Sequence, residues 1–183
     1  MKTILTLLVF LSISAMALSQ NDTSGVYLSA VDFANSKLTV PSACTSNENW
    51  IKIQNRFITV KINQEKHKFA KAEIFGVRTC RNTYRIQQNM EFKVINTDSI
   101  ILYSRSVSVS SEGSFYEDVF FFSLSPVSEI IPLTKEALKS AFSGNLKFLT
   151  FVDSSFKRDS ELGTFNKQLN KYMIIYFYEQ SLK

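Results

Sequence analysis

The chain is poor in the residues on which most catalytic and metal-binding sites are built. It has one histidine, two cysteines and five glycines among its 183 residues. The glycines do not cluster, and there is no Gly-x-Ser-x-Gly elbow, no glycine-rich phosphate-binding loop and no His-Glu-x-x-His motif. Zinc sites need three or four ligands, which one histidine beside two cysteines does not readily supply. The sequence therefore predicts no metal and no cofactor, and it favours a protein that is not an enzyme.

Long apolar runs are absent after residue 19, so no later segment predicts a helix that spans a membrane. Residues 1–19 differ. Lys2 gives a positive start, Ile4 to Ile13 form a short apolar run, and small residues end at Ser19. This pattern is typical of a cleaved secretory signal peptide and is too short for a stable transmembrane anchor. No cysteine lies near the cleavage point for lipid attachment, so we expect a secreted or periplasmic protein without an anchor.

Residues 20–183 suit one domain in length, and no linker or internal repeat divides them. Hydrophobic residues make up 45% of the chain and aromatic residues 13%, which is enough for a substantial core. We therefore expect a single folded domain after the signal peptide.

The two cysteines, Cys44 and Cys80, both fall in this domain. In an oxidising compartment a single pair of cysteines most simply forms a disulfide. Closing a loop of about 37 residues would stabilise the fold by roughly 3–4 kcal/mol. A redox pair or a metal pair is the alternative, but redox pairs are commonly spaced as Cys-x-x-Cys.

The formal net charge is +5, and the basic excess is concentrated in one stretch. Its members are Lys66, Lys68, Lys71, Arg78, Arg81 and Arg85, opposed only by Glu73. Such a patch attracts anionic envelope polymers or lipid headgroups. The structural alternative is a solvated sheet edge whose lysines block unwanted strand pairing. We expect no nucleic-acid partner, because an exported protein seldom meets one.

Alternation of apolar and polar residues, which indicates β-strands, dominates the first two thirds of the chain. A short helix begins at Ser29, which caps it, and Lys37 to Asn49 is predicted to be a loop holding Cys44. Strands are then expected at 50–54, 57–62, within 66–75, and at 83–87, 91–96, 99–109 and 115–124, with a turn at 111–114. Phe120 to Phe122 place aromatic rings on both faces, so the last strand should be covered on both sides. The short gaps permit antiparallel hairpins only.

After Pro132 the apolar period becomes helical. Thr134 is predicted to cap one helix, and Asn145 to Val152 to form a second. A third should begin at Asp159 or Ser160 and run past Tyr176. Strands first and helices last predict an α+β fold: an antiparallel sheet of about five to seven strands with a short N-terminal helix and C-terminal helices on one face.

Candidate catalytic residues are few. His67 is flanked by Lys66 and Lys68 and is best interpreted as an exposed strand residue. Five carboxylates could pair in space to serve a hydrolase: Asp32, Glu73, Glu91, Glu117 and Asp118. Five aromatic residues are either sugar-stacking or ordinary sheet residues: Tyr27, Trp50, Tyr84, Tyr103 and Tyr116.

Most of residues 20–183 resembles a family of small exported proteins from Bacteroidota. The matching segments are Gly25-Val26-Tyr27, Asp32-Phe33, Lys37-Leu38, Phe57 to Val60, Glu73 to Cys80, Tyr84-Arg85, Pro132-Leu133-Thr134, Leu138-Lys139 and Ala141-Phe142. The family often has Tyr where Val77 stands, and a glycine-containing turn where this chain has Arg81-Asn82. The resemblance implies a periplasmic or secreted bacterial protein, and it implies no activity.

Three functions from different classes follow from the sequence. The first is a non-catalytic envelope protein that binds an anionic glycan or lipid surface through the basic Lys66 to Arg85 region. The second is a structural or accessory subunit that docks on another envelope protein. The third is a hydrolase with a hidden carboxylate pair.

Overall fold

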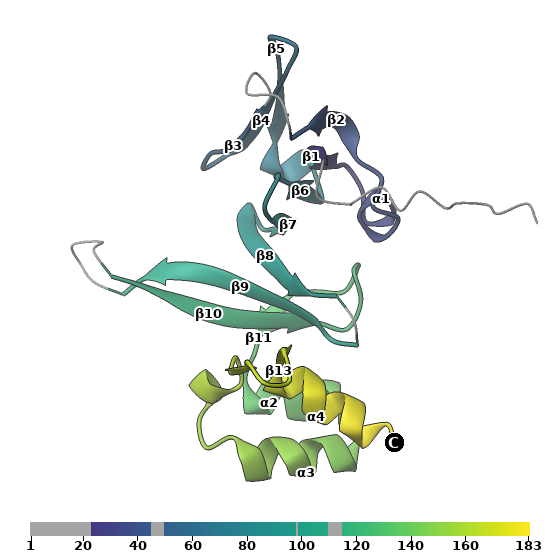
Figure 1. Ribbon diagram of the computed structural model, residues 1–183, viewed down its shortest axis with the longest axis vertical. Helices are drawn as coiled ribbons and strands as arrows, with labels where there is room; N and C mark the ends of the chain where they lie inside the picture. Colours follow the sequence, from purple (N-terminus) through teal and green to yellow (C-terminus); the bar gives the residue numbers. More distant parts are fainter. Residues whose placement is uncertain (1–22, 45–49, 98, 110–114) are drawn as a thin grey trace, which may run out of the picture.

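The computed structural model describes residues 23–44, 50–97, 99–109 and 115–183. Its central element is an eight-stranded antiparallel sheet (Figure 1). From one edge to the other its strands are β11 (Ile131–Pro132), β10 (Tyr116–Ser123), β9 (Ile101–Ser108), β8 (Met90–Asn96), β7 (Thr83–Gln87), β6 (Gly76–Arg78), β1 (Thr23–Tyr27) and β2 (Thr39–Ala43).

A second antiparallel sheet contains β3 (Trp50–Ile53), β4 (Phe57–Ile62) and β5 (Glu65–Ala70). The helices are α1 (Ala30–Ala34), α2 (Lys135–Ala141), α3 (Leu146–Ser155) and α4 (Met173–Ser181), with single 3-10 turns η1 (Lys71–Glu73) and η2 (Asp159–Glu161). A two-residue pair, β12 (Phe165–Asn166) and β13 (Lys171–Tyr172), precedes α4. The predicted α+β class is confirmed, whereas the expected sheet of five to seven strands is wrong.

The register of the large sheet decides what each face carries. Directly paired residues in an antiparallel sheet lie on the same face. One such row runs from β1 to β10 through Val26, Val77, Tyr84, Lys93, Ser104 and Phe120. At one end of this row Val26 and Val77 pack on the three-stranded sheet, and at the other Phe120 packs on the C-terminal helices. Two separate covers therefore share one face of the sheet.

The two covers enclose separate apolar clusters. The three-stranded sheet contributes Ile58 and Val60, both fully buried, to the cluster beneath it. The helices α2, α3 and α4 bury a second cluster against β9 and β10 that includes Phe122, Leu138, Phe148 and Ile174. Figure 1 shows the three-stranded sheet at one end of the molecule and the helices at the other.

The predicted helix starts follow local capping chemistry and are confirmed for the first three helices. Ser29 accepts the Asp32 N–H at 3.1 Å, Thr134 accepts the Ala137 N–H at 3.1 Å, and Asn145 accepts the Phe148 N–H at 3.0 Å. Each side chain satisfies an N–H that has no partner within its helix. The predicted aromatic cover on both sides of β10 is also present: Phe121 contacts Phe92 on one face, and Phe122 stacks on Phe142 on the other.

Two further expectations are wrong. The predicted loop from Lys37 contains β2, which includes Pro41 because an edge strand tolerates a residue that cannot donate to the ladder. The predicted long third helix is instead η2, β12 and β13, and α4 begins only at Met173. There the Asn166 carboxamide accepts the N–H groups of Gln168 and Leu169, which forms a tight turn that interrupts the helix. The predicted signal peptide and the turn at 111–114 lie outside the described residues.

None of the helices formed by the described residues is long and apolar enough to cross a membrane. The predicted disulfide is present: Cys44, just after β2, is bonded to Cys80, in the turn between β6 and β7. Disulfides are typical of oxidising compartments.

Removal of this disulfide should lower stability substantially. The bridge joins residues 36 apart in sequence, so loop entropy predicts a loss of about 3–4 kcal/mol for Cys44→Ser combined with Cys80→Ser. Urea unfolding of the wild type with and without a reductant, beside the double variant, measures it. Equal unfolding midpoints for all three would contradict the expectation.

A side chain at Gly163 should be costly, because a Cβ there would overlap the ring of Phe120. We expect Gly163→Ala to destabilise the fold by about 1–3 kcal/mol through overpacking. Gly144→Ala is the matched control, since a Cβ there meets nothing within 4 Å. Thermal unfolding compares the two. A Gly163→Ala variant as stable as Gly144→Ala would show that the Phe120 contact is not tight.

Candidate functional site

The structure divides the six predicted patch residues among three environments. Lys66 and Lys68 lie on β5 and are exposed. Arg78 and Arg81 line a cleft on the large sheet. Lys71 and Arg85 are buried, with exposed fractions of 3% and 4%. The six residues therefore do not form one surface, and two of them are not available to a ligand.

Both buried cations have structural partners. Lys71 forms an ion pair with Glu91. The Arg85 guanidinium lies over the Phe75 ring, 4.9 Å from its centroid, and donates to the Tyr103 hydroxyl at 3.3 Å. That hydroxyl in turn bonds Ser123 at 2.9 Å, so this network ties β7, β9 and β10 together. Sequence reasoning missed both roles because contacts between segments distant in sequence fix them.

The outer face of the three-stranded sheet gathers a basic surface that the sequence did not reveal. In β4, Ile58 and Val60 point into the core, so the alternate residues point outward. Register places Trp50, Lys61 and Lys66 in one outward row and Lys52, Thr59 and Lys68 in the next. We call the surface of Lys52, Lys61, Lys66 and Lys68 the lysine face. None of the strand residues paired on this outer face is acidic.

Aromatic rings flank the lysine face. Trp50 and Phe57 are each 37% exposed, and the Lys68 ammonium lies 3.9 Å from the Phe57 ring centroid. Of the other aromatic residues considered from sequence, Tyr27 and Tyr103 are core residues with almost no exposure. Tyr84, on β7, packs against the cluster beneath the three-stranded sheet, and Tyr116 is 69% exposed on β10. Trp50 is therefore the one of these that stands beside the lysines.

Lys61 is the informative member of the lysine face. It lies directly opposite Lys66 on the neighbouring strand, and like charges in that position destabilise a sheet. Lysines on edge strands discourage strand pairing, but β4 is the central strand of its sheet, so this explanation does not apply to Lys61. The strand pairing offers no structural reason for this charge cost, so the lysine face is a candidate binding surface.

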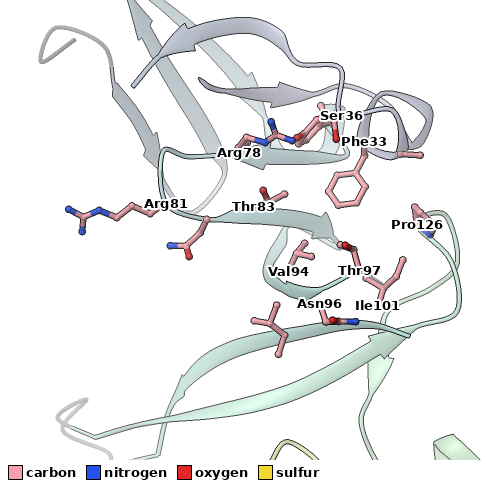
Figure 2. A pocket seen from close by; sticks show the side chains of 14 residues that line it. Phe33, Ser36, Arg78, Arg81, Thr83, Val94, Asn96, Thr97, Ile101 and Pro126 are labelled. Atoms are coloured by element: carbon pink, nitrogen blue, oxygen red, sulfur yellow. The ribbon is translucent and has the colours of Figure 1, made fainter. Parts of the chain in front are cut away.

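The cleft lies on the large sheet beside α1 and has a volume of about 560 Å³. Figure 2 shows Phe33 and Arg78 on one side and Val94, Asn96 and Ile101 on the other. Arg81 lines the rim, and its side chain extends away from the other labelled residues (Figure 2). The described lining includes no Asp or Glu.

Arg78 also shapes the electrostatics of the cleft wall. Its guanidinium carbon lies 5.5 Å from the centroid of the Tyr27 ring. Burial raises the pKa of the Tyr27 hydroxyl above its usual range, and the Arg78 charge and hydrogen bond offset part of that rise. Gly76 leaves room for the Phe33 ring and the neighbouring strand, because a Cβ there would lie 3.3 Å from the Phe33 ring and 2.7 Å from the Tyr84 carbonyl oxygen.

A second hollow of about 450 Å³ brings two of the five candidate carboxylates, Glu91 and Asp118, to one site. It lies where Lys93 and Ser104 continue the row between the two covers of the sheet. Glu91 is already paired with Lys71, and Asp118 accepts from the Ser106 hydroxyl. Both carboxylates thus have structural partners, which does not favour the hydrolase alternative.

The described part of the chain contains no cluster of residues that could hold a metal ion, and its histidine has a structural position. No group of three or more His, Cys, Asp or Glu residues converges there. His67 is a half-buried strand residue whose Nε2 lies 3.7 Å from a Glu65 carboxylate oxygen. The lysine face and the cleft are therefore the two candidate functional surfaces.

Comparisons with protein families, with curated proteins and with solved structures found no match for this chain. The resemblance to exported Bacteroidota proteins stays a prediction, and the function rests on the site alone.

The Lys71–Glu91 pair should be needed for stability. Glu91→Gln removes the counter-charge of an ammonium that is 2% exposed at the side chain, and an uncompensated buried charge costs about 3–5 kcal/mol. Glu91 itself is 29% exposed, so we expect a loss near the lower end. Glu117→Gln, at an exposed position of β10, is the control. Chemical unfolding measures both, and equal stability of the two variants would contradict this role.

Proposed function

We propose that this protein is a non-catalytic binding protein for an anionic glycan, and that the lysine face is its contact surface. The observation that carries the proposal is the direct pairing of Lys61 with Lys66 within a four-lysine surface. Because the described strand residues paired on this face include no carboxylate, no residue of the same face neutralises the charge. A bound polyanion would relieve the repulsion and supply the compensating charge.

The dimensions of the lysine face suit a repeating anion. Residues two apart on a strand are separated by about 6.7 Å, and adjacent strands by about 4.8 Å. The four lysines therefore present several cations within the span of one or two charged sugar units. Trp50 stands at the end of the first row, where its partly exposed ring offers an apolar surface to a sugar.

A glycan fits this face better than a lipid bilayer. Binding in a membrane interface depends on apolar side chains that insert below the headgroups. Here the aromatic rings are only 37% exposed, and Lys68 covers Phe57 rather than leaving it free to insert. We place the protein in an oxidising compartment, secreted or periplasmic, where the disulfide persists and envelope glycans are encountered.

One observation favours a second function, that of an accessory subunit. The β9–β10 hairpin extends away from the body of the molecule (Figure 1), and its far end carries Phe115 and Tyr116, 71% and 69% exposed. A protein contact built on these rings would survive high salt, whereas a contact through the lysine face would not.

Charge removal on the lysine face should abolish most glycan binding. We expect Lys61→Gln combined with Lys66→Gln to weaken binding to alginate at least about tenfold, since each lysine near an anionic surface contributes about 1 kcal/mol. Calorimetric titration at about 50 mM and about 500 mM NaCl should also show wild-type affinity falling steeply with salt. The double variant should be as stable as wild type or slightly more so, because a like-charge pair is removed.

The controls separate this proposal from its competitors. Lys147→Gln combined with Lys167→Gln removes two exposed charges near the helical end and should leave alginate binding unchanged. Dextran, a neutral glycan, should not bind. Unchanged alginate affinity in the Lys61/Lys66 double variant, or preferential binding to phosphatidylglycerol vesicles over alginate, would overturn the proposal.

A further inference from the structure

We propose that the cleft beside α1 is a second and separate binding site, which takes a small organic anion with an apolar body, such as an aryl or alkyl carboxylate. The inference is independent of the lysine face. It rests on the volume of the cleft, on the position of Arg78 and on the unequal chemistry of its two walls.

The volume suits a small molecule rather than a polymer. At about 560 Å³ the cleft falls within the range of sites that bind metabolites and drug-sized ligands. It is formed by segments distant in sequence: α1 and β6 on one side, β8 and β9 on the other, and the loop holding Pro126. A concave site assembled in this way has fixed walls, because the sheet hydrogen bonds hold three of its segments.

The cation of the site is held in position. Arg78 leaves β6 toward the cleft, and its stacking beside Tyr27 restricts the guanidinium to one region of the wall. A guanidinium is permanently charged and presents a planar fork of donors that matches a carboxylate. Because the described lining holds no Asp or Glu, an entering carboxylate meets no like charge from these residues.

The opposite wall is largely apolar. Val94 and Ile101 belong to a buried apolar cluster with Phe92 and Tyr103, and their surfaces continue into the cleft. Phe33 faces them from α1, and Pro126 lies at the end of the gap (Figure 2). A ligand whose charged end meets Arg78 would therefore lay an apolar body between Phe33 and Ile101.

Polar groups at the margins add directional contacts. Thr83 on β7 and Asn96 and Thr97 after β8 provide hydroxyl and amide groups beside the apolar wall. Asn96 is fixed, because its amide donates to the Ile100 carbonyl at 2.9 Å. A few placed polar groups around an apolar surface are typical of sites that select one ligand orientation. A simple inorganic anion would leave the apolar wall unused.

The test uses 4-phenylbutyrate as the probe and its uncharged primary amide as the matched control. Titration followed by two-dimensional NMR of the ¹⁵N-labelled protein should shift the backbone amides of Thr83, Val94 and Ile101 with the acid. The amide should bind at least about tenfold more weakly, because it lacks the charge that Arg78 recognises. Equal shifts with acid and amide, or no shift with either, would overturn the proposal.

Variants locate the binding. Thr97→Trp places a bulky ring at an exposed position of the cleft, where folding is easily retained, and should abolish the shifts. Arg78→Gln should weaken acid binding to the level of the amide, whereas Arg78→Lys, which keeps the charge, should retain part of it. Lys167→Gln is the control, since it removes an exposed positive charge at a position that does not line the cleft.

The outcome is distinguishable from that of the glycan proposal. The Lys61→Gln/Lys66→Gln variant should bind 4-phenylbutyrate as wild type does, and Thr97→Trp should bind alginate as wild type does. Loss of phenylbutyrate binding in the lysine-face variant, or retention of it in Thr97→Trp, would assign the probe to another surface and overturn the cleft site.

Discussion

The antiparallel register of the large sheet is the constraint on which the rest of the molecule depends. Its pairing sets Val77 opposite Tyr84 and Ser104 opposite Phe120, so one face is apolar at both ends and polar between them. A shift of one residue would turn every side chain of a strand to the other face. The buried Arg85–Tyr103–Ser123 network reinforces this register, because its hydrogen bonds are satisfied only when β7, β9 and β10 are aligned as they are.

The alternation of inward and outward side chains also creates the lysine face. This face is on the outer side of the three-stranded sheet, away from the large sheet. The three-stranded sheet is fixed by its inner residues, Ile58 and Val60, which the large sheet buries. Its outer residues contribute little to that core, so they are free to be chosen for another purpose. This separation explains how Lys61 and Lys66 can face each other without disrupting the fold: the buried apolar area outweighs a repulsion that water screens.

Local sequence patterns predicted many of the helices and strands, but they did not predict which distant segments pair. The caps Ser29, Thr134 and Asn145 are readable because an N-cap acts within one helical turn. The turn at Asn63-Gln64 is less readable: both residues have positive φ, 48° and 71°, and Gln64 stands where such a turn usually has glycine. The stripe of apolar residues after Asp159 looked helical, but the Asn166 turn and the close contact of Gly163 with Phe120 oppose a continuous helix.

The predicted basic patch shows that functional surfaces are subject to the same limit: sequence does not reveal which distant residues come together. A run of cations along the chain does not say which of them share a face, and Lys71 and Arg85 are in the core. What the run did locate is the turn that carries the cleft arginines. Thr79 closes this turn, since its hydroxyl donates to the Asn82 carbonyl at 3.0 Å and accepts the Asn82 N–H at 3.0 Å. Cys80, inside the turn, is bonded to Cys44 at the end of β2. The disulfide therefore does more than shorten the unfolded chain: it ties the backbone between Arg78 and Arg81 to the end of β2.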